Sequence, residues 1–189
     1  MQDSRIDTSD MAEQQYTGEN YETYRRAMDL HSLGYSLIPI SRWSKKPIVK
    51  WKRFQTERCS TADVLAWFGR GGCRIGIVTG QLSGIVVVDC DDLDAIDALL
   101  DDSLRDGGLE ESRQTQRTKR GMHFFFRHPG TDTRNGRGFL GAKIDVRGDG
   151  GYVLAYEDAS FLDRREMPLF RELSREAADA CEMALAGIN

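Results

Sequence analysis

The stretch that decides the fold is Arg74–Asp92, RIGIVTGQLSGIVVVDCDD. Its two apolar runs, 74–79 and 85–91, have the length and the β-branched content of strands, and the glycine-bounded segment 80–84 between them predicts a turn. The second run is apolar on both faces, which is typical of a central strand in a covered sheet. Its last residues are acidic, so this strand carries both a core and a candidate site.

The sequence on either side predicts further strands and helices from amphipathic spacing and from short β-branched or aromatic runs. The predicted helices are 21–33, 62–68, 93–100 and 171–185, and the further strands are 35–40, 122–127, 143–147 and 152–155. Gly148–Gly151 predicts a turn of the hairpin type between the last two strands. Because strands and helices are mixed without strict alternation, the expected fold class is α+β.

The chain is long enough for one domain with short additions. Residues 1–18 are polar without periodicity, which predicts a disordered N-terminal segment. Residues 19–170 form the expected catalytic domain, and 171–189 the expected C-terminal helix, which would link to a partner domain. No apolar run approaches membrane-span length and no secretory signal is visible, so a cytoplasmic protein without membrane contact is expected. The four cysteines form no C-x-x-C pair, so no zinc site is expected.

The net charge of −4 hides an uneven distribution. Residues 113–147 hold nine Lys or Arg against two Asp, and residues 42–53 interleave six basic residues with two Trp. Basic residues mixed with aromatic ones favour a nucleic-acid partner, because phosphates and bases can both be bound. A solvated loop is the alternative for either cluster. The expected nucleic-acid contacts are Lys45, Lys46, Trp51 and Lys52.

The strand 85–91 ends in two carboxylates, Asp89 and Asp91, which share one face because side chains alternate along a strand. Two like charges on one face repel each other unless a cation lies between them. Mg²⁺ or Mn²⁺ would remove that repulsion, since these ions prefer hard oxygen ligands. The alternative is that Asp91 or Asp92 caps the following helix.

A histidine, His123, lies on the phenylalanine-rich strand 122–127. It follows Arg117, Lys119, Arg120 and a glycine, which together predict a phosphate-binding turn. His123 would then donate a hydrogen bond to a phosphate oxygen. The alternative is a buried histidine with a structural role.

A third acidic position, Asp145, shares a strand face with Arg147 and can complete a metal site with Asp89 and Asp91. A structural Asp145–Arg147 ion pair is the alternative. Three carboxylates holding two metal ions can activate a primer 3′-hydroxyl and stabilise in-line displacement at phosphorus. Asp89, Asp91, Asp145 and His123 are therefore the candidate catalytic residues.

This order of motifs resembles the bifunctional DNA primase/polymerase (prim-pol) domain of the archaeo-eukaryotic primase superfamily, which occurs in plasmid, phage and other mobile-element replication proteins. The resemblance covers about residues 25–160. The residues that carry it are Asp89-Cys-Asp91, Gly121-Met-His123 and Asp145, flanked by Gly34–Pro39, Lys46-Pro47, Trp51, Ile75–Gly80 and Asp145–Val153.

The resemblance implies an RRM-like catalytic sheet packed with a smaller α/β subdomain, with the active site in the cleft between them. It implies a nucleotidyltransferase that uses nucleoside triphosphates, a DNA template or primer, and two Mg²⁺ or Mn²⁺ ions, without zinc. The implied metal ligands are Asp89, Asp91 and Asp145, and the implied nucleotide contacts are His123, Arg117, Lys119, Arg120 and Arg147. A helicase in trans, or in a longer parent chain, is an expected partner, because no G-x-x-x-x-G-K-[ST] motif is present.

Two other functions are open at this point. A metal-dependent nuclease also uses acids and a histidine, but the H-x-H pair of rolling-circle nickases is absent, since His123 and His128 are five residues apart. A non-catalytic module that binds single-stranded nucleic acid is disfavoured, because three acids in the cleft would oppose a polyanion without metal.

Overall fold

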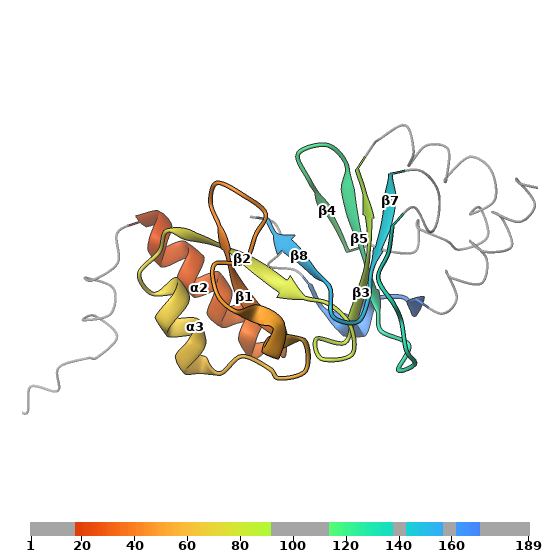
Figure 1. Cartoon of the computed structure of the whole chain (residues 1–189), viewed down its shortest axis with the longest axis horizontal. Helices are drawn as coiled ribbons and strands as arrows, with labels where there is room; N and C mark the ends of the chain where they lie inside the picture. The colour runs from red at the N-terminus through yellow and green to blue at the C-terminus, as the bar shows by residue number, and fades with distance from the viewer. Residues whose placement is uncertain (1–17, 92–113, 138–142, 157–161, 171–189) are drawn as a thin grey trace, which may run out of the picture.

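The computed structural model describes residues 18–91, 114–137, 143–156 and 162–170, which form two antiparallel sheets with helices beside the smaller one (Figure 1). The fold class is therefore α+β, as predicted. None of the described helices is long and apolar enough to cross a membrane.

The smaller sheet has the strand order β1–β2–β8. Its strands are β1 (Leu37–Ser41), β2 (Cys73–Val78) and β8 (Tyr152–Ala155), and the helices packed beside it are α2 (Gly18–Ser32) and α3 (Thr61–Phe68). The sequence explains both helices. Ser60 caps α3 through a reciprocal capping box with Asp63, and the chain leaves α2 through Gly34 at φ +95°. Both helices contribute apolar side chains to the core under this sheet.

The larger sheet has the order β4–β5–β3–β7–β6. Its strands are β3 (Ile85–Cys90), β4 (Thr115–Arg117), β5 (Met122–Arg127), β6 (Gly136–Arg137) and β7 (Ile144–Arg147). Every residue of β3 is buried, which confirms it as a central, covered strand. Val87 belongs to the core shared with the smaller sheet, while Val86 and Val88 pack with Phe124 and Phe126 on the opposite face.

The predicted helices and strands are present wherever the structure describes them, usually within one or two residues. The short strands β4 and β6 and the 3-10 helices η1 (Trp51–Gln55) and η5 (Arg164–Glu166) lie where the sequence predicts no regular structure. The helices expected at 93–100 and 171–185 lie outside the described residues.

The prediction that 148–151 forms a hairpin is wrong. The segment is a turn, but β7 pairs with β3 and β6 in the larger sheet, whereas β8 pairs with β2 in the smaller one. The turn from β2 to β3, residues 79–84, makes the same passage between sheets. Two crossings between the sheets, at residues 79–84 and 148–151, are therefore described in full, and they are bound to each other.

The two crossings are joined by a polar cluster, here called the crossing node, made of Thr79, Gly80, Gln81, Thr133 and Asp149. Asp149 accepts hydrogen bonds from the N–H groups of Gln81 (2.8 Å) and Thr133 (2.9 Å). The hydroxyl of Thr79 donates to the carbonyl of Gly148 at 2.7 Å. One carboxylate thus connects three loops, which sets how the two sheets meet.

Acid should weaken the crossing node. Burial raises the pKa of Asp149, but the N–H groups of Thr133 and Gln81 and the neighbouring His128 outweigh it, so the pKa lies below its ordinary value. A carboxyl with a lowered folded-state pKa stabilises the fold above its unfolded pKa, about 3.9, and this stabilisation is lost as the pH falls through the folded pKa. We expect Asp149→Asn to lower the urea concentration at the midpoint of unfolding clearly at about pH 6, and much less at about pH 2.5.

The control is Asp132→Asn, which changes an exposed carboxylate of the same region whose only described ion pair, with Arg134, is itself exposed. An Asp149→Asn deficit of equal size at both pH values would show that the carboxylate charge does not hold the node.

Candidate active site between the two sheets

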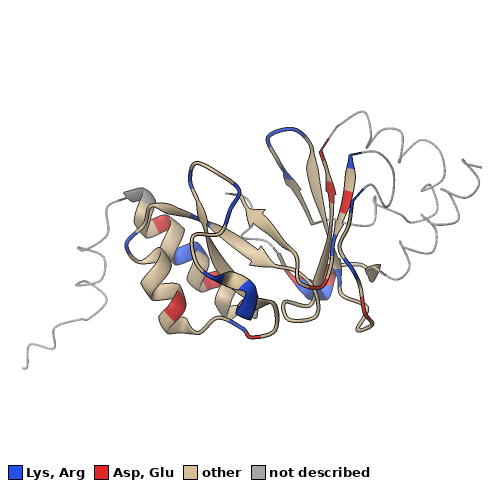
Figure 2. Cartoon of the chain, viewed as in Figure 1, with Lys and Arg blue, Asp and Glu red and all other residues tan. Residues whose placement is uncertain are grey.

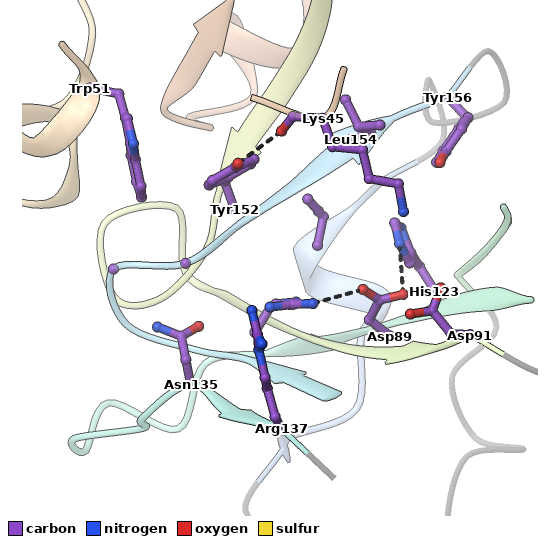
Figure 3. Close-up of a pocket in the computed structure, with 14 residues that line it drawn as sticks. Lys45, Trp51, Asp89, Asp91, His123, Asn135, Arg137, Tyr152, Leu154 and Tyr156 are labelled. Atoms are coloured by element: carbon purple, nitrogen blue, oxygen red, sulfur yellow. Dashed lines mark hydrogen bonds and ion pairs between the residues drawn. The ribbon is translucent and has the colours of Figure 1, made fainter. Parts of the chain in front are cut away.

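Strand register brings three of the predicted residues into one row. Asp89 on β3 lies directly opposite His123 on β5 and directly opposite Asp145 on β7. Side chains opposite each other on antiparallel strands have Cβ atoms about 5 Å apart and point to the same face. The row therefore spans the three middle strands of the larger sheet. Figure 3 shows Asp89 and His123 of this row on the face that is turned toward the smaller sheet.

Asp89 is the centre of this row. Its Oδ1 lies 3.3 Å from His123 Nε2, and its Oδ2 lies 3.3 Å from Arg147 Nη2. The same Arg147 nitrogen donates to Asp145 Oδ2 at 2.7 Å. Burial raises the pKa of Asp89, but His123 and the Arg147 guanidinium outweigh it, so the pKa is lowered and the carboxylate is ionised at neutral pH.

Asp91 continues the same face two residues further along the chain. Its N–H donates to the carbonyl of Lys143 at 2.9 Å, which extends the ladder between β3 and β7 by one residue. Its carboxylate is 3.5 Å from Arg120 Nη2 and is more exposed than that of Asp89, at 36% against 12%. Asp89 is therefore a fixed position at the base of the site, and Asp91 a more accessible one at its rim.

A pocket of about 420 Å³ lies over this row and between the two sheets (Figure 3). Asp89, Asp91, His123 and Arg147 line it from the larger sheet. Arg137 lines it from β6 of the same sheet. The residues that line it from the remaining chain are Lys45, Trp51, Asn135, Gly150, Gly151, Tyr152, Val153, Leu154 and Tyr156. The site is thus assembled from both sheets, and Asp145 stands beside it in contact with Arg147.

The wall opposite the carboxylates is held by β8. The Tyr152 ring meets the Trp51 ring edge-on with centroids 4.9 Å apart, and the Tyr152 hydroxyl donates to the Lys45 carbonyl at 2.8 Å. These contacts join the loop after β1 to β8. Asn135 fixes the crossing segment below by accepting from the Gly148 N–H at 3.0 Å and donating to the Asp149 carbonyl at 2.7 Å.

The predicted contacts from the basic segments lie in four places. Lys45 and Trp51 line the pocket, whereas Lys46 and Lys52 are exposed outside it. Lys119 and Arg120 lie on the β4–β5 turn, where Arg120 meets Asp91. Arg117 lines a neighbouring pocket.

In the predicted phosphate-binding turn, the Thr118 hydroxyl accepts hydrogen bonds from the backbone. The N–H groups of Arg120 and Gly121 both donate to the Thr118 hydroxyl, at 3.3 Å and 3.0 Å. The Thr118 N–H donates to the Gly121 carbonyl at 2.9 Å. The turn therefore offers the charged side chains of Lys119 and Arg120 to a phosphate, while the backbone N–H groups of Thr118, Arg120 and Gly121 are already used.

Residues missed by the sequence reasoning are Asn135, Arg137, Tyr152 and Tyr156. Arg137 belongs to the basic stretch 113–147, so its type gave a weak signal. Tyr156 follows β8, where nothing in the local pattern marks it. These residues reach the site only through the pairing of β6 with β7 and of β8 with β2.

The donor set fits a divalent cation in chemistry. Asp89, Asp91 and Asp145 supply hard oxygens from one sheet face, and Asp89 is ionised. In the part of the chain that the structure describes, no three His, Cys, Asp or Glu side chains surround a common point ready for an ion. Two arginines lie among these carboxylates: Arg147 forms ion pairs with both Asp89 and Asp145, and Arg120 forms one with Asp91.

Residues 27–164 match the family described as bifunctional DNA primase/polymerase, N-terminal domain. The chain belongs to this family. The match covers more than half of the 189 residues and includes the whole carboxylate–histidine row. No match was found among curated proteins. The prim-pol resemblance is thereby confirmed.

Membership of the prim-pol family assigns the chain to the nucleotidyltransferase class of enzymes, with primase or polymerase activity. Enzymes of this family generally use divalent metal ions, and DNA and nucleotides are the substrates that the family implies. The carboxylates and cations of the pocket are suited to both, because phosphates need cationic partners and metal ions need oxygen ligands.

Proposed function

We propose that this prim-pol domain is a template-directed DNA primase or polymerase, which joins nucleoside triphosphates in a plasmid, phage or other mobile-element replication system. The observation that carries the proposal is the row His123–Asp89–Asp145 across three paired strands, two members of which, His123 and Asp89, line a pocket between two sheets. A binding module would have no use for this arrangement, because buried carboxylates repel a polyanion.

Asp89, Asp91 and Asp145 are the proposed ligands of two Mg²⁺ or Mn²⁺ ions. When bound, such ions lower the pKa of the attacking hydroxyl and neutralise charge on the phosphoryl group. The protein residues supply position. Asp89 is held from both sides, by His123 and Arg147, so its carboxylate is presented in one orientation.

Arg147 and His123 are the proposed contacts of the triphosphate within the pocket. Arg147 neutralises Asp89 and Asp145 in the absence of another cation, and a cation bound there would free its guanidinium for a phosphate. His123 is buried, and its Nδ1 has no hydrogen-bond partner among the described residues. Its ring is 5.9 Å from the Tyr156 ring, which limits how it can turn.

The more peripheral basic residues are proposed to bind the outer parts of the substrates. Lys119 and Arg120 on the β4–β5 turn are suited to the triphosphate tail, and Arg117 is a further proposed nucleotide contact that lines the neighbouring pocket. Lys45, Lys46, Trp51 and Lys52 are proposed nucleic-acid contacts. We also propose that the larger sheet is RRM-like, and that a helicase acts with this domain.

The test is primer extension with the purified chain, a labelled primer on a DNA template, nucleoside triphosphates, and Mg²⁺ or Mn²⁺. We expect a metal-dependent ladder of longer products, and a second reaction without primer measures primer initiation. Shortened primer would replace the proposal by a metal-dependent nuclease. Unchanged primer with retained DNA binding would replace it by a non-catalytic binding module.

A further inference from the structure

A second pocket of about 900 Å³ lies next to the candidate active site. It is here called the arginine groove. Its lining includes four arginines and two aromatic residues: Arg26, Arg42, Arg74, Arg117, Trp43 and Tyr156. Arg26 lies on α2 and Arg42 on the loop that follows β1. Arg74 lies on β2 and Arg117 on β4, so both sheets contribute (Figure 1). Figure 2 shows basic residues on the loop after β1 and on the β4–β5 turn, the two loops that border this side.

The charge of the arginine groove is strongly positive. Of its lining residues, Glu22 carries the opposing charge, and its carboxylate is 2.8 Å from Arg25 Nη2. Four guanidinium groups that line one pocket repel one another, and a bound polyanion offsets this repulsion. Guanidinium groups bind phosphates with two parallel hydrogen bonds, which makes them suited to a phosphodiester chain.

Trp43 is presented to solvent on an anchored loop. Its side chain is 95% exposed, the largest exposure among the described large hydrophobic residues. The loop is held by Arg74, whose guanidinium donates to the carbonyls of Ser41 (3.1 Å) and Ser44 (2.7 Å). The Trp43 N–H also donates to the Ser41 hydroxyl at 3.2 Å. An indole held outward on a fixed backbone is ready to stack on a planar group.

The groove leads into the active site through Tyr156. This residue lines both pockets, and its ring lies 5.9 Å from that of His123. Arg26 donates a hydrogen bond to the Tyr156 carbonyl, which ties the tyrosine to α2. A ligand lying along the arginines therefore ends beside the row of Asp89 and His123.

We propose that the arginine groove binds the single-stranded DNA template, with its phosphates on the arginines and a base stacked on Trp43. That the bound strand is a template rests on the proposed polymerase function. Single-stranded DNA is favoured over a duplex because stacking on Trp43 needs a base with a free face, and duplex bases already stack on each other. Tyr156 then marks the point at which the template enters the active site.

The test is fluorescence anisotropy with a labelled oligothymidylate of about 15 nucleotides, without metal ions and at several salt concentrations. We expect Trp43→Ala to weaken binding about fivefold or more, and Trp43→Phe to retain most of the affinity. Arg42→Gln should reduce the slope of log K against log salt by about 0.7, the value for one lost contact to a single strand. The matched control is Arg127→Gln, which removes an exposed arginine at the other end of β5 from His123.

Wild-type affinity for oligothymidylate in both Trp43→Ala and Arg42→Gln would overturn the proposal, whatever the primer-extension result. It would also be overturned if these variants lost binding to a blunt DNA duplex, or to a nucleoside triphosphate, as strongly as to the single strand. In primer extension, the template role is supported if Trp43→Ala and Arg42→Gln raise the half-saturating template concentration and leave kcat unchanged. If the wild-type chain binds through Trp43 but extends no primer, the proposed function fails and the groove remains a single-strand site.

Discussion

Replacing Asp89 by Asn should reduce primer extension by at least about 10³-fold while the chain stays folded. Asp89 is the centre of the row, with His123 on one side and Arg147 on the other. Asn keeps the shape of the side chain but removes its charge, and it replaces one of the two oxygens that face His123 and Arg147 by a donating NH2 group. A cation that relies on this carboxylate loses a charged ligand, and about 4 kcal/mol of lost transition-state stabilisation corresponds to this factor.

The variant is expected to fold because Arg147 keeps its hydrogen bond to Asp145 at 2.7 Å. Circular dichroism melting checks this, and calorimetric titration with Mn²⁺ checks that ion binding is what is lost. Asp132→Asn, which removes an exposed carboxylate away from the row, serves as the activity control. Extension at more than a tenth of the wild-type rate by Asp89→Asn would exclude Asp89 as a metal ligand.

The second large effect concerns Gly80 at the crossing node. Gly80 has φ +95°, and a Cβ placed there would lie 2.6 Å from the Asp149 Cα. Since that neighbour is backbone, relief requires moving one of the two crossings. We expect Gly80→Ala to lower the free energy of unfolding by at least about 3 kcal/mol, or a Tm fall of roughly 6–12 °C for a chain of this size.

Gly130 offers a matched comparison for this prediction. It has a similar left-handed backbone, φ +82°, but a Cβ there meets nothing within 4 Å. Gly130→Ala therefore measures the backbone strain by itself, about 1–2 kcal/mol. Thermal melts of both variants separate the two causes, and equal Tm losses would mean that the close contact at Gly80 is not limiting.

Local patterns were sufficient for most elements and for part of the site. Strand 122–127 and helix 62–68 were predicted because both depend on short-range signals, a run of phenylalanines in one case and amphipathic spacing in the other. The shared face of Asp89 and Asp91 follows from the strand period alone. That both act as ligands stays a prediction.

Register and connections needed the tertiary structure. Nothing near Asp145 in the chain indicates that it lies opposite Asp89, since pairing between distant strands is set by the whole core. The glycine-rich segment 148–151 has the composition of a hairpin turn, and the same composition also serves a turn that passes between sheets. The arginine groove was invisible for the same reason, because Arg26 and Arg117 are brought together only by the fold.

The position of β8 has a consequence for how the chain folds. This strand, near residue 155, completes the smaller sheet by pairing with β2, whose other partner β1 begins at Leu37. Such long sequence separation slows folding, because the loop must close before its contacts form. During synthesis, the apolar edge of β2 has no partner until Tyr152–Ala155 have left the ribosome. Any fragment that ends before β8 would keep that edge open and be prone to aggregation.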